Sequence, residues 1–143
     1  MQFTPDSKSI LLAGMGPMRD PMAGNGRQLW QKWSFDGEPK KLDETHEGES
    51  GEGLMETLSI HPSHEYFAMG GRLRGGDWNV ALFNLKDGNR IATLKTGYRV
   101  TEANFTDDGQ QLVLVGTQGQ PGPDKDGVIA DFGRVEVYDL ESA

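Results

Sequence analysis

The chain contains no cysteine, which excludes a disulfide framework, a thiolate metal site and a cysteine nucleophile. Long apolar stretches are also missing, since the longest runs are about five residues and a membrane-spanning helix needs about 20. No positively charged stretch followed by an apolar run opens the chain, so we expect no signal peptide. These absences leave the compartment open: cytoplasmic, or periplasmic or exported if the chain is part of a longer protein.

Positive charge is scarce as well. The net charge of −8 opposes binding to a phosphate backbone, so we expect neither a nucleic-acid partner nor a membrane partner. Helix signals are weak, because no window of about eleven residues carries an apolar stripe at helical spacing without a glycine or proline. With 20 glycines and 7 prolines in 143 residues, the composition predicts one turn-rich domain built from β-strands.

What the chain does contain is one pattern that occurs three times. Each copy has an apolar anchor, a polar turn, an apolar run and a glycine eleven residues after the anchor. The anchors and their glycines are Phe3 and Gly14, Ile60 and Gly71, and Phe105 and Gly116. A repeat of about fifty residues indicates one supersecondary unit that stacks on itself.

The second half of each copy recurs too. A strand rich in aromatic and β-branched residues ends near Trp33, Phe83 or Tyr138, at matching positions. An Asp-Gly turn and a short further strand follow in the first two copies, at 40–42 and 91–94. The pattern therefore predicts that each unit forms four antiparallel strands, which we call a to d in chain order. In the third unit strand d is missing from the prediction. The predicted units cover residues 1–42, 54–94 and 99–143.

These repeats resemble the blades of WD40-type β-propellers. The turns Thr4-Pro5-Asp6-Ser7 and Thr106-Asp107-Asp108-Gly109 are similar to the Ser-Pro-Asp-Gly turn of that family, and Tyr138-Asp139 is similar to its Trp-Asp pair. The stretch from Trp33 to Leu42 also resembles the repeats of TolB-like propellers. The family's Gly-His pair before strand a is missing here. The resemblance implies an all-β propeller fold.

Three blades are too few for a closed ring, because propellers close with about four to eight. We therefore predict a β-propeller segment that is incomplete as a ring, with an exposed blade face at each end and unpaired strand edges. Such surfaces recruit other strands. Two alternatives follow: the remaining blades belong to a longer chain, or several copies self-associate.

In an antiparallel unit the b–c and d–a loops share one rim, where the loop lengths vary. Loops on a rigid scaffold commonly carry function, so we predict a protein or peptide partner on this rim. Methionines offer adaptable contacts and the acidic loop 43–54 would attract a basic partner, although packing or a solvated loop explains both as well. The predicted partner-binding residues are Met15, Met18, Arg19, Met22, Glu47, Glu49, Glu52, Arg72, Arg74, Tyr98, Arg99 and Lys125.

Signals for catalysis and for metal are weak. Asp124 and Asp126 precede a glycine as carboxylates of a calcium loop do, but the rest of that loop is absent and a solvated loop explains them better. His61 and His64 lack a third ligand nearby in sequence. We expect no cofactor and a non-catalytic binding scaffold. The alternative is part of a propeller enzyme, of hydrolase or quinoprotein type, with its active site at the central channel.

Overall fold

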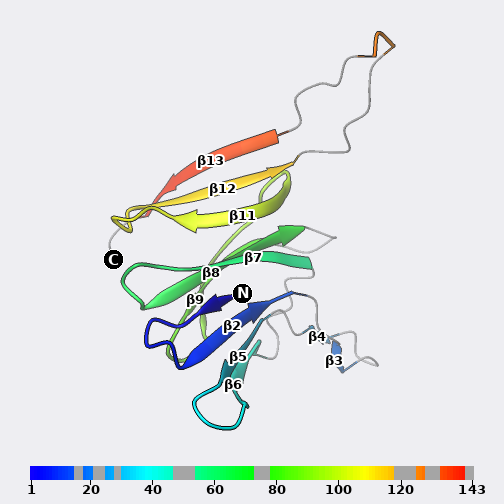
Figure 1. Cartoon of the computed structure of the whole chain (residues 1–143). Coiled ribbons are helices and arrows are strands. Elements are labelled where there is room, and N and C mark those ends of the chain that lie inside the picture. Colours follow the sequence, from blue (N-terminus) through cyan, green and yellow to red (C-terminus); the bar gives the residue numbers. More distant parts are fainter. Residues whose placement is uncertain are drawn as a thin grey trace.

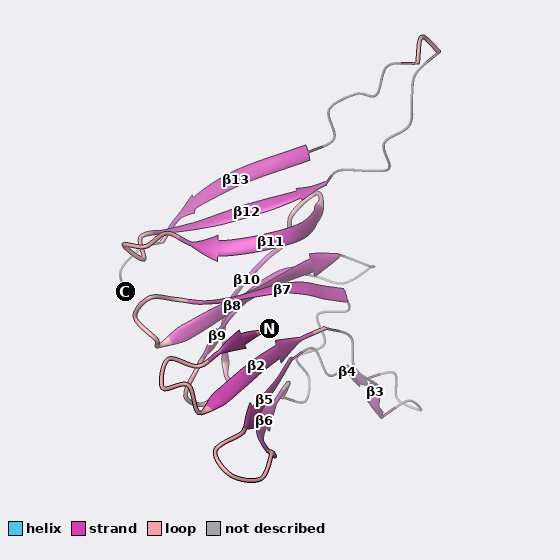
Figure 2. Ribbon diagram, viewed as in Figure 1, coloured by secondary structure: helices cyan, strands magenta, loops and turns pink. Residues whose placement is uncertain are grey.

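The computed structural model describes residues 1–14, 18–20, 25–27, 30–46, 54–72, 78–117, 125–127 and 133–140, with the backbone alone at 18–20, 25–27 and 54. Every regular element within these residues is a β-strand (Figure 2). The strands are β1 (Gln2–Phe3), β2 (Ser9–Ala13), β3 (Met18–Asp20), β4 (Asn25–Arg27), β5 (Trp30–Ser34), β6 (Lys40–Glu44), β7 (Leu54–Ile60), β8 (Tyr66–Arg72), β9 (Val80–Asn84), β10 (Arg90–Leu94), β11 (Arg99–Phe105), β12 (Gln111–Thr117) and β13 (Gly133–Asp139).

Three antiparallel sheets form the body of the molecule. Their strand orders are β1-β2-β5-β6, β7-β8-β9-β10 and β11-β12-β13. The sheets stack in chain order, and the stack is open rather than closed into a ring (Figure 1). β7 packs against both β1 and β11, so the first strands of the three sheets lie next to one another. The prediction of an all-β propeller segment with about three antiparallel blades, incomplete as a ring, is confirmed.

The alternation of side chains along each strand explains the stacking. Phe67 and Met69 of β8 are buried in one core with the first sheet, whereas Ala68, between them, is buried in a second core with the third sheet. We call the side of each sheet that turns toward the next sheet along the chain its trailing face, and the opposite side its leading face. The middle sheet thus buries both of its faces.

The polar a–b turns share one hydrogen-bond pattern, which explains why they recur in the sequence. Asp6 Oδ1 accepts the Thr4 hydroxyl at 2.7 Å and the Lys8 N–H at 2.9 Å. Asp108 Oδ1 accepts the Thr106 hydroxyl at 2.7 Å and the Gln110 N–H at 3.0 Å. In each turn the aspartate two residues after the threonine therefore caps the turn, a role that suits aspartate.

Two details differ from the sequence prediction. The b–c loop of the first unit, predicted to carry Met18 and Arg19 on the rim, contains β3, which pairs with β4 as a small separate hairpin (Figure 1). β6 continues to Glu44, so the first two residues of the predicted acidic loop 43–54 belong to a strand. β3 and β4 are too short to show apolar alternation, and the end of β6 is too charged, so the sequence did not predict them.

Candidate functional site

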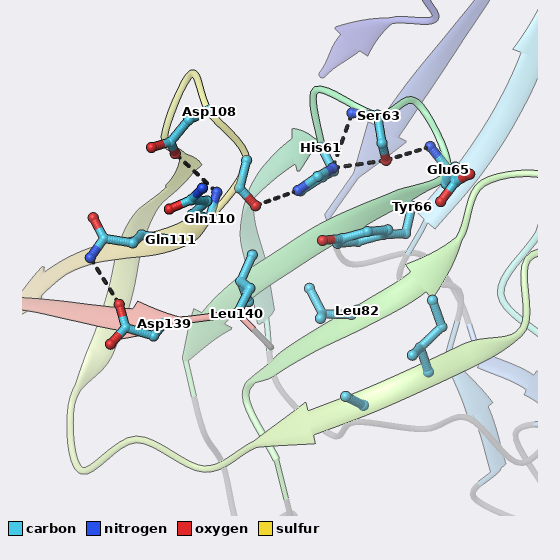
Figure 3. A pocket seen from close by; sticks show the side chains of 13 residues that line it. His61, Ser63, Glu65, Tyr66, Leu82, Asp108, Gln110, Gln111, Asp139 and Leu140 are labelled. Carbon is cyan, nitrogen blue, oxygen red and sulfur yellow. Dashed lines mark hydrogen bonds between the residues drawn. The ribbon is translucent and has the colours of Figure 1, made fainter. Parts of the chain in front are cut away.

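An open groove of about 980 Å³ lies between the second and third sheets. One wall is the β7–β8 turn and the other is the β11–β12 turn, while β9, β10 and the end of β13 complete it (Figure 3). The groove therefore lies on the side of the a–b turns. The rim predicted to bind a partner, with the b–c and d–a loops, is at the opposite ends of the strands.

His61 joins the two walls. Its ring stacks on Tyr66 with centroids 4.2 Å apart and meets Phe105 of the third sheet edge-on at 4.9 Å. Its Nε2 lies 2.8 Å from the carbonyl oxygen of Gly109, in the opposite turn. Gly109 has φ +72°, and a Cβ at this position would come within 2.8 Å of the His61 ring. The close approach of the two turns thus depends on glycine at 109.

The partners of His61 assign its tautomer. Nδ1 accepts the backbone N–H of Ser63 at 3.0 Å, so the proton lies on Nε2, which donates to Gly109. Ser63 Oγ is also 2.8 Å from Nδ1 and accepts the Glu65 N–H at 3.2 Å. A serine beside a histidine has the spacing of a nucleophile and its base. Ser63 occupies the turn position that Asp108 has in the third sheet, so we assign the pair to the turn.

Two acidic groups of the groove, Asp108 and Asp139, are engaged in local contacts. The hydrogen bonds from Thr106 and then from Gln110 lower the pKa of Asp108 below its ordinary value. Asp139, at the end of β13, accepts a hydrogen bond from the Gln111 amide at 2.9 Å. These carboxylates hold the turn and the strand pair together.

The remaining lining is apolar and follows the edge of a sheet. Leu82, Ile91 and Ala92 come from the outer strands of the second sheet, and Leu140 follows β13 (Figure 3). β12 pairs with one edge of β13 along its whole length. No described strand pairs with the other edge of β13. The groove thus combines apolar side chains with the end of a strand whose outer edge has no described neighbour.

The first two sheets show what lies at this edge when a sheet has four strands. β10 pairs with β9 from Arg90, opposite Phe83, to Leu94. Phe83 corresponds to Tyr138 in the third repeat, so a fourth strand of the third sheet would begin beside Asp139 and Leu140. Such a strand would run past Leu82 and Ala92, which line the groove. The groove therefore lies where a fourth strand of the third sheet would lie.

Four residues of the predicted rim have described side chains. Tyr98 is buried, and burial followed by the charge of Glu136 raises the pKa of its hydroxyl, so it lies in the core rather than on the surface. Arg99 pairs with Glu56 across β7 and β11, with Nε 2.6 Å from Oε2, and this hydrogen bond raises the pKa of Arg99. Arg72 ends β8, and Lys125 lies in an exposed turn.

The other rim predictions fall where side chains are not described. Met18 and Arg19 belong to β3. The residues outside the described part are Met15, Met22, Glu47, Glu49, Glu52, Arg74 and, from the calcium prediction, Asp124. Asp126 lies in the exposed turn 125–127. Among the described residues no three His, Asp or Glu side chains gather closely enough to hold a metal ion.

A buried polar network on this rim was not predicted. Asn79 is fully buried, and its amide group donates to Gly71 O at 3.0 Å and to Thr96 Oγ1 at 2.8 Å, while its Oδ1 accepts the Thr96 N–H at 2.8 Å. These bonds join the end of β8, the start of β9 and the loop after β10. A polar residue directly before the apolar run of strand c was the only sequence signal for it.

The chain matches no known protein family model, and no curated protein is similar to it in sequence. Within the described part of the chain, no helix has the length and apolar character needed to span a membrane.

Proposed function

We propose that this chain is a WD40-like propeller scaffold without catalytic activity, and that it binds an extended segment of a protein or peptide. The observation that carries the proposal is the groove of about 980 Å³ at the end of β13, a strand whose outer edge has no described neighbour. A strand added to a sheet edge gains main-chain hydrogen bonds, and side-chain pockets select its sequence. The loop rim remains a second predicted contact surface for the same partner.

The groove suits a strand with apolar residues on one side. Ile91 is 55% exposed and Leu82 is half-buried, so both have apolar surface left to cover. No described strand lies beside the outer edge of β13, and a sheet edge of this kind can bind another strand through its N–H and C=O groups. The apolar surface and the end of the strand edge lie side by side, because Leu82 and Leu140 line the same groove.

The chain itself supplies a defined probe. A synthetic peptide with the sequence of residues 87–96 contains β10, the strand that completes the second sheet. We expect this peptide, carrying a fluorescent label, to bind the full chain with micromolar affinity, and a scrambled peptide of the same composition not to bind. Hydrogen exchange should show new protection at alternate residues of 133–139 when the peptide is bound, because the N–H groups that point away from β12 gain partners.

A matched pair of variants tests the place of binding. Ile91 lines the groove, and Leu42 has the corresponding position at a bulge in β6 of the first sheet, where it is 49% exposed. Ile91→Lys should weaken peptide binding about tenfold, which corresponds to about 1.4 kcal/mol, and Leu42→Lys should leave it unchanged. Absence of binding at millimolar peptide, or equal weakening by both variants, would contradict the proposal.

The enzyme alternative requires ionisable residues from several blades at the central axis. Among the described residues, the first strands of the second and third sheets contribute the Glu56–Arg99 pair there. An ion pair of this kind joins neighbouring blades and does not by itself provide an acid, a base or a nucleophile. Screening the chain for hydrolase and oxidoreductase activity tests this second proposal, and turnover abolished by Glu56→Gln would support it over the scaffold.

A further inference from the structure

The outer face of the third sheet is an unusual surface for a solvent-exposed sheet, because it carries four valines together. Val113 lies opposite Val137, and Val115 lies opposite Val135, so all four point to the trailing face. Val135 is 68% exposed and Val137 is 54% exposed. We call these four residues the valine face.

The molecule itself shows what covers this face in a repeat. The positions of Val113 and Val135 correspond to Leu11 and Trp30 in the first sheet, and to Ala68 and Val80 in the second. Leu11 and Trp30 are buried under the leading face of the second sheet. Ala68 and Val80 are buried under the leading face of the third. In both cases the cover is the leading face of another blade.

The chain also has one leading face that no described sheet covers. It belongs to the first sheet, where Phe3, Ile10 and Trp33 are direct cross-strand neighbours. Phe3 is 60% exposed, and it packs edge-on against Phe35, which is 42% exposed. We call this surface, with Leu12, the aromatic face.

The equivalents of the aromatic face are core residues elsewhere. Phe67 and Phe83 of the second sheet correspond to Ile10 and Trp33, and both are buried against the first sheet. Leu112 of the third sheet also corresponds to Ile10, and it is buried against the second sheet. The two exposed faces are therefore the two halves of one type of contact that the molecule makes twice internally.

We infer that the aromatic face of a second copy of this chain covers the valine face, so that copies associate head to tail. The apolar character of both faces drives the association, since each removes large side chains from water. The net charge of −8 repels the copies at long range and makes the association stronger at high salt.

A polar contact at the inner edge supports the same alignment. Between the first and second sheets, Gln2 Oε1 accepts the backbone N–H of Ile60 at 2.8 Å. Asn104 has the position of Gln2 in the third repeat, next to the valine face. In the head-to-tail arrangement its side-chain oxygen is the acceptor for the N–H of Phe3, which corresponds to Ile60.

Contacts of this kind join different surfaces, so they generate either a closed ring or an open chain of molecules. Two copies supply six blades, which is within the range of about four to eight that closes a propeller. The inference concerns a surface on the opposite side of the third sheet from the groove, so it stands or falls independently of peptide binding.

Two double variants test the inference by light scattering coupled to size exclusion. Val135→Lys with Val137→Lys disables the valine face, and Phe3→Lys with Phe35→Lys disables the aromatic face. We expect the wild-type chain to show a mass of at least twice its 15.7 kDa at high micromolar concentration, and each variant alone to be a monomer. An equimolar mixture of the two variants should form a one-to-one complex, because each variant keeps one intact face.

The control variant adds the same two charges elsewhere. Leu42→Lys with Thr93→Lys places both lysines on exposed positions of the outermost strands, and it should assemble like the wild type. The mixed complex also shows that both face variants are folded. A wild-type monomer at millimolar concentration would overturn the inference, as would a wild-type oligomer whose two face variants fail to combine, since that result indicates a contact between identical surfaces.

Discussion

The middle sheet and the third sheet share one repeat but differ in the side chains on their trailing faces. At one matched position the middle sheet has Gly70 and the third sheet has Val115; at another they have Ala68 and Val113. A Cβ on Gly70 would lie 2.8 Å from Val100 Cγ1 of the next sheet. In this pair of sheets the small residues occur where the next blade packs closely, and the larger ones occur on the face that no described sheet covers.

This difference shows that burial in the repeat depends on the neighbour and not on the position alone. Trp33, Phe83 and Tyr138 occupy one repeat position, yet Phe83 is fully buried and the other two are only half-buried. Truncating the side chain at one repeat position should therefore lower the free energy of unfolding by different amounts in different sheets. Substitutions at matched positions are the direct way to measure that difference.

The largest difference is expected at the aromatic position of strand c. Phe83→Ala removes a ring that packs against Phe67 and Trp30, and it should lower the free energy of unfolding by about 3–5 kcal/mol. Trp33→Ala should cost only about 1 kcal/mol, because its ring lies on the open aromatic face. Urea unfolding of both variants, at a concentration where the chain is monomeric, measures the contrast.

The concentration dependence sharpens this test. If copies associate through the aromatic face, the cost of Trp33→Ala rises when the protein concentration is raised, because Trp33 then becomes buried. The cost of Phe83→Ala does not change in the same way. Equal costs for the two variants in the monomer would mean that the faces of the first and second sheets are equally covered.

The repeat glycine at the end of strand b gives the second contrast. A Cβ on Gly116 would come within 2.0 Å of the Arg99 carbonyl oxygen, a backbone atom that cannot rotate away. Gly14, its equivalent in the first sheet, has no described atom within 4 Å of such a Cβ. Gly116→Ala should therefore lower the free energy of unfolding by about 1–3 kcal/mol, and Gly14→Ala should change it little.

Thermal unfolding monitored by circular dichroism distinguishes these outcomes. For Gly116→Ala we expect a lower midpoint, because β11 and β12 must separate to admit the methyl group. A midpoint for Gly116→Ala equal to that for Gly14→Ala would indicate that the two strands can move apart without cost. In that case the third sheet is more adaptable than its close strand pairing implies.

Much of the fold could be predicted from sequence because its determinants are local. The a–b turns need a Thr or His followed by Asp or Ser at a fixed spacing, and the strands need alternating apolar residues, so both leave regular signals. The β3–β4 hairpin left no such signal, since each strand has three residues and one contains glycine. Short strands depend on their surroundings more than on their own sequence.

The groove could not be predicted, because it forms where residues from two repeats meet. His61 and Gly109 are 48 positions apart, and their contact depends on how the second and third sheets pack. The partner of Asn79, Thr96, follows a different strand of the same sheet, so this contact too depends on how strands assemble rather than on one segment of sequence. Arg99, a predicted surface residue, pairs with Glu56 of the preceding blade for the same reason. A single repeat carries no information about which neighbour it meets.

The smallest expected effect concerns the acidic turn residues, where the end sheets and the middle sheet differ in chemistry. Asp6 and Asp108 cap their turns as carboxylates, whereas the middle sheet uses the uncharged Ser63. The backbone N–H of Lys8 and the Thr4 hydroxyl lower the pKa of Asp6, and the Thr106 hydroxyl and the Gln110 N–H lower that of Asp108. A carboxylate whose pKa is lower in the folded state stabilises the fold above its ordinary value of 3.8.

That stabilisation is lost as the pH falls from the ordinary value through the lower pKa of the folded state. We therefore expect an NMR titration of the carboxyl carbons to place both aspartates below 3.8 in the folded chain, and the amide signals of Lys8 and Gln110 to titrate with them. The amide of Glu65, bonded to Ser63 Oγ, should not follow either aspartate. Asp108→Asn removes one titrating cap, so acid unfolding of this variant should depend less steeply on pH below about 4. An unchanged slope would mean that the amide signals report the local turn alone, and that the exposed caps contribute equally to the folded and unfolded chains.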